Sequence, residues 1–346
     1  MTSKERTRAA MRYQKPDKVP VQYYYCPVGY YEHGEKLNDL YAQLEGDFEP
    51  FRRVTPAGPD AGDYDADGSY HGYRRDDWGT LWEYRIFGIA GIPKEYPLGD
   101  ESKIAAYKAP QISQAAIAGI AARARDLHEG GFYSLSGCGS LYERLIALRP
   151  EADVLCDLIS GEEYIHQLAD TIMENNAVLV KAAVDAGADG IAFGDDYGLE
   201  RGLIMSPELW RSFFKPRLAS LFKPAVKAGM EIHFHSCGYV RDLLEDFAEI
   251  GVTSVWPQLP AYNMEDLAAR CRSLGLAVAI HTDRARTMTF GKPEEVRALA
   301  LREYETFKLY GGGGWFYIEA DNGFPFANIE ALVATIKELR DGNYTI

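Results

Sequence analysis

Five short segments of the chain share one pattern, in which glycine precedes an apolar run of the kind that forms β-strands. They read EGGFYSL, AGADGIAF, KAGMEIHF, EIGVTSVW and GGGGWFYI. A helix that ends at glycine and leads into a β-rich run is typical of a helix-to-strand connection. Its repetition predicts a parallel sheet with helical crossovers. The predicted strands are residues 19–25, 132–136, 190–194, 231–235, 254–257, 277–281 and 315–319.

The choice between an open sheet and a closed barrel rests on where polar residues fall. No Gly-x-Gly-x-x-Gly motif follows the first strand, and no phosphate-binding loop motif occurs. Polar residues instead follow many strands, whereas an open sheet needs them only beside its switch point. We therefore predict an α/β fold, a (β/α)8 TIM barrel that forms a single domain over residues 1–346. Residues 46–110 are rich in Asp, Gly, Tyr and Arg and break the alternation, so we interpret them as a loop-rich insertion that could act as a lid.

Composition excludes some classes of partner. The formal net charge is −14, which disfavours nucleic acid and anionic membranes because both require a basic face. The five cysteines are odd in number and widely spaced, which is typical of reduced thiols in a cytoplasmic protein. The chain contains no run of about 18 apolar residues and begins without an apolar leader. We expect a soluble, cytoplasmic protein, and a homodimer is compatible with the sequence.

The segment GMEIHFHSCG places an imidazole and a thiol at the end of a predicted strand. Residues two apart on a strand face the same side, so His235 and Cys237 can point at a common atom. Both are zinc ligands, with bonds of roughly 2.0–2.3 Å. The alternative is a polar strand end with an inert thiol. His233 lies one step deeper and is expected to be a hydrogen-bonded core residue. Residues at other strand ends that could supply a third ligand are Glu319, Asp321, His281, Asp283 and Cys138.

Two further groups of residues follow predicted strands. Asp195 and Asp196 are adjacent, so at most one is expected to point into the barrel mouth, where it could bind a cation, take a proton or orient a histidine. The alternative is a salt bridge to Arg201. Aromatic and polar residues near loop ends could contact a flat or methylated ligand, although aromatics more often fill cores. The predicted substrate-binding residues are Tyr25, Trp78, Tyr197, Gln258 and His281.

Several motifs resemble the uroporphyrinogen decarboxylase superfamily, whose members share a (β/α)8 barrel. They include KPDKVPV, DDWGTLWEYRIFGIAGIPKEYPLGD, GSLYERLIALR, GADGIAFGDDYGLERGLIMSPELW and GMEIHFHSCGYVRDLLEDF. The superfamily contains porphyrinogen decarboxylases and zinc-dependent methyltransferases that serve corrinoid proteins or coenzyme M. The decarboxylases carry an arginine-rich N-terminal motif, whereas the corresponding stretch here is VPVQYYYCPVGYYEHG, without arginine. An acidic tetrapyrrole needs cationic anchors, so this difference disfavours uroporphyrinogen decarboxylation.

The methyltransferase branch carries His-x-Cys and a later cysteine as zinc ligands. His235 and Cys237 match the first two, and the later stretch reads YIEADNGFP, where Glu319 or Asp321 would replace the thiolate. The resemblance thus implies a zinc-assisted methyltransferase that moves a methyl group between a small methylated compound, such as a methoxyaromatic, and a corrinoid protein. Asp195 or Asp196 would orient or protonate the leaving group, with His235 in the same catalytic set. The alternatives are a metal-free decarboxylase, acting on a small acid or porphyrinogen, and a non-catalytic binding protein.

Overall fold

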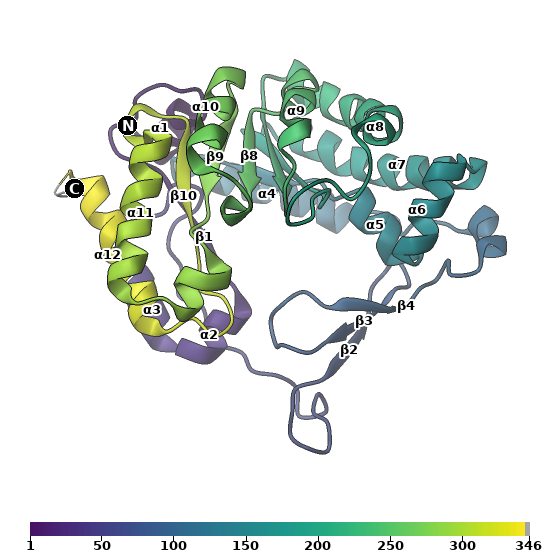
Figure 1. Ribbon diagram of the computed structural model, residues 1–346, viewed down its shortest axis with the longest axis horizontal. Coiled ribbons are helices and arrows are strands. Elements are labelled where there is room, and N and C mark those ends of the chain that lie inside the picture. The colour runs from purple at the N-terminus through teal and green to yellow at the C-terminus, as the bar shows by residue number, and fades with distance from the viewer. Residues whose placement is uncertain (343–346) are drawn as a thin grey trace.

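The structure is a computed structural model that describes residues 1–342 (Figure 1). Its centre is a curled sheet in which all neighbouring strands are parallel, in the order β1-β10-β9-β8-β7-β6-β5. Each strand overlaps one of the seven predicted from sequence, and the TIM-barrel-like α/β fold is confirmed. The strands are β1 (Val21–Tyr24), β5 (Leu135–Gly137), β6 (Gly190–Gly194), β7 (Glu231–Ser236), β8 (Ser254–Pro257), β9 (Ala277–Ile280) and β10 (Gly314–Glu319).

The gap between the two edge strands, β1 and β5, is bridged by hydrogen bonds of a single residue, Asp47, instead of by an eighth strand. The backbone N–H of Asp47 donates to the Val21 carbonyl at 2.8 Å, and its carbonyl accepts from the N–H of Tyr133 at 3.3 Å. Phe48 then packs its ring against Tyr133 and Trp315, at centroid distances of 5.5 Å each. Asp47 therefore occupies the place in the ring that a full strand holds in a regular (β/α)8 barrel.

Helices surround the sheet, with α1 lying across the N-terminal ends of the strands (Figure 1). From α1, Arg8 forms an ion pair with Asp189, which precedes β6, and Arg12 forms one with Glu231, which begins β7. The helices are α1 (Ser3–Met11), α2 (Pro27–His33), α3 (Glu35–Tyr41), α4 (Gln114–Glu129), α5 (Tyr142–Leu148), α6 (Glu151–Ser160), α7 (Glu163–Asp185), α8 (Pro207–Lys227), α9 (Leu244–Glu249), α10 (Met264–Leu274), α11 (Pro293–Phe307) and α12 (Phe326–Asp341). Within residues 1–342, none of these helices has the length and hydropathy required to span a bilayer.

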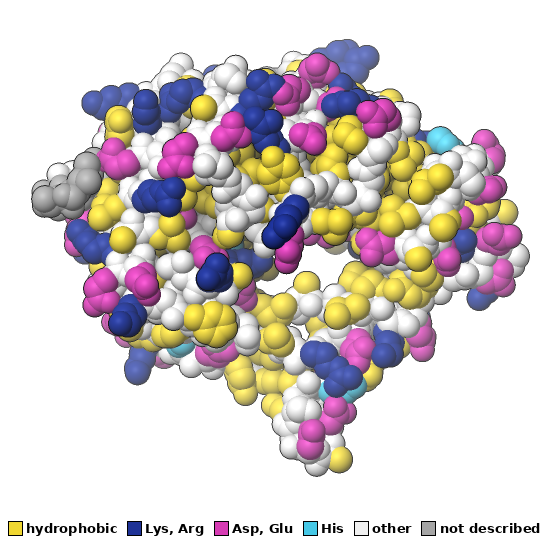
Figure 2. Space-filling model, viewed as in Figure 1, with side chains coloured by type: hydrophobic (Ala, Val, Ile, Leu, Met, Phe, Trp, Pro, Cys, Tyr) yellow, Lys and Arg dark blue, Asp and Glu magenta, His cyan; other side chains and the backbone are white. Residues whose placement is uncertain are grey.

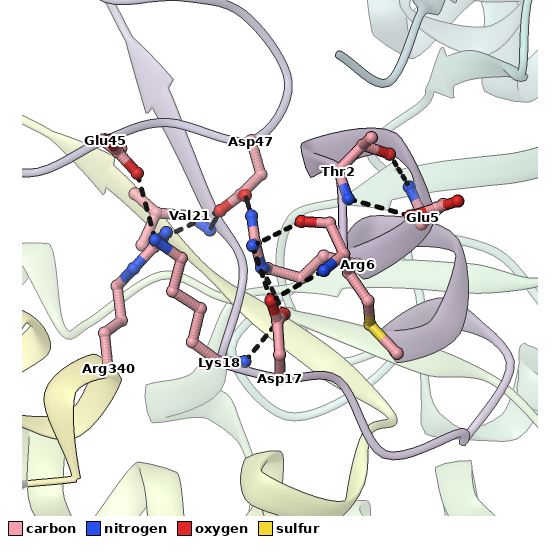
Figure 3. Close-up of polar contacts among 10 residues, drawn as sticks. Thr2, Glu5, Arg6, Asp17, Lys18, Val21, Glu45, Asp47 and Arg340 are labelled. Atoms are coloured by element: carbon pink, nitrogen blue, oxygen red, sulfur yellow. Dashed lines mark hydrogen bonds and ion pairs between the residues drawn. The ribbon is translucent and has the colours of Figure 1, made fainter. Parts of the chain in front are cut away.

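A buried charge network joins the first helix, the closing residue and the last helix. The Asp47 carboxylate accepts from Arg6 Nη1 at 2.6 Å, from Arg340 Nη1 at 2.8 Å and from the Val21 N–H at 2.9 Å. Figure 3 shows Asp47 between the two arginines, with Asp17 as a further partner of Arg6. The Asp47 side chain is fully buried, so the network ties the first and last helices, α1 and α12, to the barrel seam.

Residues 72–95 form an arm that projects from the barrel on the side of the strands' C-terminal ends. It contains a three-stranded antiparallel sheet of β2 (Gly72–Arg75), β3 (Leu81–Tyr84) and β4 (Ile92–Glu95). Figure 2 shows a hollow between this arm and the barrel body. The β3–β4 loop returns toward the barrel, and its Ile86 and Ile89 line the cavity described below. That contact places the insertion beside the mouth, and its role as a lid stays a prediction.

One buried carboxyl group in the helical layer gives a stability prediction. Glu303 on α11 accepts a hydrogen bond from the Thr282 hydroxyl at 2.8 Å, and full burial raises its pKa to about 8. Above about pH 4.5 the unfolded state releases the Glu303 proton, whereas the folded state keeps it up to about pH 8. The free energy of unfolding therefore falls as pH rises from about 4.5 to 8. Glu303→Gln keeps the hydrogen-bond acceptor but does not titrate. Between pH 5 and pH 8 wild type is therefore expected to lose about 3 kcal/mol of stability relative to this variant.

Urea unfolding at the two pH values measures this difference. A Glu303→Gln variant whose stability changes with pH in parallel with wild type would show that Glu303 does not bind the extra proton.

Candidate functional site

A cavity of about 390 Å³ opens at the C-terminal ends of β7, β8, β9 and β10. Parallel strands deliver their terminal side chains to this face, which is where TIM barrels carry their sites. Its walls combine apolar and ionisable groups. They include His235, Cys237, Trp256, Gln258, His281, Arg284 and Asp321.

Three side chains with metal-binding atoms converge beside this cavity. The donor atoms of Asp196, His235 and Cys237 all lie within 4.8 Å of one another. Cys237 Sγ is 3.4 Å from His235 Nε2, and Asp196 Oδ1 is 3.5 Å from the same nitrogen. Two ligands of one tetrahedral zinc lie roughly 3.3–3.6 Å apart, given bonds of 2.0–2.3 Å. The residues present therefore fit a zinc ion.

The surroundings of His235 prepare its Nε2 for such a ligand role. Its Nδ1 lies 2.9 Å from the Trp256 carbonyl, which can only accept, so Nδ1 carries the proton and Nε2 presents its lone pair. Burial lowers the pKa of His235, which favours the neutral ring. The Trp256 indole packs against the imidazole at a centroid distance of 4.2 Å. His235 is thus held in one orientation and in the state that binds metals.

Cys237 and Asp196 are positioned by a loop contact that needs two glycines. Gly238 has φ of +71°, and a Cβ there would overlap the backbone of Gly198. This close approach brings the loop after β6 against the loop after β7, where the Cys237 N–H donates to Asp196 Oδ1 at 2.7 Å. Burial and the Asp196 charge raise the pKa of Cys237 to about 12, so metal binding would have to displace the thiol proton.

The structure separates the two adjacent aspartates predicted for catalysis. Asp195 is fully buried and accepts hydrogen bonds from the backbone N–H groups of Leu141, Tyr142 and Glu143, at 2.9–3.0 Å. It satisfies the free amides at the start of α5 and does not face the mouth, so its predicted catalytic role is corrected to a structural one. Asp195 makes these hydrogen bonds instead of the salt bridge to Arg201 that was the alternative prediction.

The predicted substrate-binding residues divide into two groups. Gln258 and His281 line the cavity, and Gln258 Oε1 also accepts from the Gly238 N–H at 3.0 Å. Tyr197 is fully buried and donates to Asp195 at 2.6 Å, so it is a core residue and that prediction is wrong.

Tyr25 and Trp78 are not among the residues that line the cavity. The Tyr25 hydroxyl accepts from the Arg52 N–H at 3.3 Å, and the Arg144 guanidinium lies 4.8 Å from the Trp78 ring centroid. Tyr25 thus contacts the insertion, and Trp78 joins the insertion to α5. Neither ring lines the cavity.

Glu319 and Asp321, predicted as metal ligands with His235 and Cys237, lie in a different cluster. Their donor atoms group with Cys26 at the end of β1, all within 4.8 Å of one another. Burial and the charge of Asp321 raise the pKa of Glu319 to about 7. The carboxylate beside the His-x-Cys pair is therefore Asp196, and the sequence-based choice of Glu319 or Asp321 is corrected.

Two residues of the mouth were missed by the sequence reasoning. Glu143, on α5, is an exposed residue beside Asp196 and outside the cavity lining, and desolvation of its carboxyl group together with the nearby Asp196 and Asp195 charges raises its pKa to about 7. Arg284, on a short π-helix (Arg284–Met288), lines the cavity and pairs with Asp321 at 3.1 Å. Glu143 lies within a helix, beyond the predicted strand 132–136, so reasoning from strand ends could not identify it.

The fold and the donor set define a TIM-barrel-like protein with a candidate metal centre at its mouth. The family model described as "Uroporphyrinogen decarboxylase (URO-D)" matches residues 147–313. This match includes Asp196, His235 and Cys237, and it confirms the resemblance to the uroporphyrinogen decarboxylase superfamily. No curated protein matches the chain.

One solved structure supports this fold, and others share less of it. The chain is similar to a methyltransferase from Methanosarcina mazei, with 18% identity, 98% of this chain and 99% of that chain covered, and a TM-score of 0.64. A dihydropteroate synthase from Xanthomonas albilineans with 4-aminobenzoic acid has 12% identity, covers 60% of this chain and 66% of that chain, and has a TM-score of 0.36. A xylose isomerase-like TIM barrel protein from Mycobacterium smegmatis in complex with magnesium has 13% identity, 67% and 80% coverage, and a TM-score of 0.38.

Proposed function

We propose that this protein is a methyltransferase that moves a methyl group between a small methylated compound and a corrinoid protein, with zinc at the mouth of the barrel. The observation that carries the proposal is the convergence of Asp196, His235 and Cys237 beside a cavity of about 390 Å³. The superfamily match and the fold shared with a methyltransferase support it.

Asp196, His235 and Cys237 would hold the zinc. When bound, the ion supplies a Lewis acid that stabilises negative charge on the atom from which the methyl group departs. The protein's own groups perform the positioning. The Trp256 carbonyl fixes the His235 ring, and the Cys237 N–H holds the Asp196 carboxylate, so the three donors need little rearrangement to act together.

The cavity walls favour a flat, largely apolar methyl donor. The Trp256 indole lies between aromatic neighbours, with centroid distances of 4.2 Å to Tyr317 and 5.6 Å to His281. Ile86 and Ile89 of the arm and Phe324 complete the apolar lining. These surfaces suit a methoxyaromatic compound, whose ring can pack on Trp256 while its ether oxygen faces the Asp196, His235 and Cys237 donors. Glu143 beside Asp196 is a group that can hold a proton for the departing oxygen.

The charge of the cavity disfavours the decarboxylase alternative. Arg284 is the cationic side chain among the described residues that line the cavity, and it is already paired with Asp321 at 3.1 Å. A substrate with several carboxylates needs several unpaired cations to replace its hydration. The same wall carries Asp283 and Asp321, which would repel an anion.

The proposal is tested with free cob(I)alamin as the acceptor probe and a panel of methoxybenzenes as donors. Formation of methylcobalamin, followed by its absorption spectrum, is expected with protein that contains zinc. Activity should disappear after dialysis against a strong chelator and return when zinc is added. Undiminished methyl transfer by zinc-free protein would overturn the role of the metal, and release of carbon dioxide from a small acid without methyl transfer would favour the decarboxylase.

A further inference from the structure

We propose that the protein binds a second divalent metal ion, zinc by its donor chemistry, at a site formed by Cys26, Glu319 and Asp321. These residues are distinct from the Asp196, His235 and Cys237 set. Their three donor atoms lie within 4.8 Å of one another, and the Cys26 and Glu319 side chains are buried. The inference goes beyond the proposed methyl transfer and does not depend on it.

Local packing holds the three residues together. β1 and β10 are parallel neighbours with Tyr24 opposite Glu319, so the residues that follow the two strands emerge side by side. Gly29 in α2 packs so closely on Ala320 that a Cβ at residue 29 would overlap the Ala320 carbonyl oxygen. This contact seats the start of α2, and with it Cys26, against the segment that carries Glu319 and Asp321. The cluster is therefore built by the core of the fold and not by mobile surface side chains.

An unpartnered histidine provides an independent indication of a ligand. The His281 side chain is only 9% exposed, and its Nε2 lies 3.5 Å from Glu319 Oε2. That nitrogen is buried and has no hydrogen-bond partner among the described residues. A buried polar atom without a partner is costly and rare in a folded protein. A metal ion bound by Glu319 would give this nitrogen a partner by direct coordination.

The donor chemistry selects the ion. Carboxylates alone suit calcium or magnesium, whereas a thiolate with carboxylates and an imidazole suits zinc. The positive charge now near the cluster comes from Arg284, whose Nη1 is 3.1 Å from Asp321 and 3.8 Å from Glu319. Its side chain is 41% exposed, so it can turn to solvent when an ion takes its place. Arg284 is thus a competitor of the metal at this site.

The two metal sites share one cavity but have separate ligands. Asp321 and His281 line the same cavity as His235 and Cys237, and the Trp256 ring packs against both imidazoles, at centroid distances of 4.2 Å and 5.6 Å. Loss of one ligand set should therefore leave the other able to bind its ion.

The experiment measures metal stoichiometry in the full-length protein. Apoprotein is titrated with Co²⁺ as a spectroscopic zinc surrogate, and zinc content is determined separately by elemental analysis. Wild type is expected to bind two equivalents, while Cys26→Ser and Cys237→Ser each bind one. Cys156→Ser, which removes an exposed thiol outside both clusters, is the matched control and should still bind two. Methyl transfer should fail in Cys237→Ser, which retains the second ion, so failure of the two proposals can be distinguished.

Arg284→Gln provides a test that does not remove a ligand. Removing the competing charge should tighten binding at the second site by about tenfold, since the Arg284 guanidinium lies within 4 Å of both carboxylates. Wild type that binds one equivalent, lost entirely in Cys237→Ser, would overturn the inference. So would Cys26→Ser or Glu319→Gln protein that binds the same number of ions with the same affinity as wild type. Glu319→Gln also serves if Cys26→Ser does not fold.

Discussion

Cys237→Ala is expected to remove one equivalent of zinc from the protein and to abolish methyl transfer in the same step. The thiol lies 3.4 Å from His235 Nε2, and two remaining donors do not make a stable zinc site. A Lewis acid contributes several kcal/mol to stabilising a transition state, so activity should fall by about 10³-fold or more. Elemental analysis and the methylcobalamin assay measure the two losses on one sample.

Cys156→Ala is the control, since Cys156 is exposed and lies outside both metal-ligand clusters. It should keep the zinc content and the activity of wild type. Circular dichroism and thermal unfolding of both variants separate loss of metal from loss of fold. Cys237→Ala protein with undiminished activity would exclude Cys237 from the mechanism.

Asp47→Ala is expected to lower the free energy of unfolding by about 3–5 kcal/mol, the range for breaking a buried ion pair from one side. The substitution leaves Arg6 and Arg340, with side chains 7% and 3% exposed, without the carboxylate between them. It also removes the acceptor of the Val21 N–H at the barrel seam. Urea unfolding followed by tryptophan fluorescence measures the change.

Glu45→Ala is the matched comparison because Glu45 pairs with Lys18 next to the same network but is 83% exposed (Figure 3). An exposed pair contributes at most about 1 kcal/mol, so this variant should stay close to wild type. Equal effects of the two substitutions would show that the Asp47 network does not fix the seam.

The regular part of the fold follows from the sequence pattern, and its irregular part does not. Strands 190–194 and 254–257 were predicted with the bounds that the structure shows, because glycine before an apolar run marks them clearly. The strand predicted at 132–136 begins only at Leu135, since the N–H groups of Tyr133 and Ser134 donate to Asp47 and Asp189. A single residue such as Asp47 has no periodicity, so no pattern could identify it as the link between two strands.

The candidate site was predictable where it depends on one strand and unpredictable where it depends on several. Alternation along β7 correctly paired His235 with Cys237. It could not say which of Asp195 and Asp196 turns toward them, because that depends on the free amides of α5. The choice among distant carboxylates was equally open, since spacing along the chain says nothing about which strand ends are neighbours in space. Burial of Tyr197 depends on the same tertiary contacts.

The seam at Asp47 has a consequence for how such a chain can diversify. The projecting arm, residues 72–95, lies between Asp47 and Tyr133 in the chain, so it is inserted where the ring is held by one peptide unit. An arm of another length or composition could replace this one without breaking any strand pairing. The arm beside the mouth can therefore vary while Asp196, His235 and Cys237, at the ends of β6 and β7, keep their places.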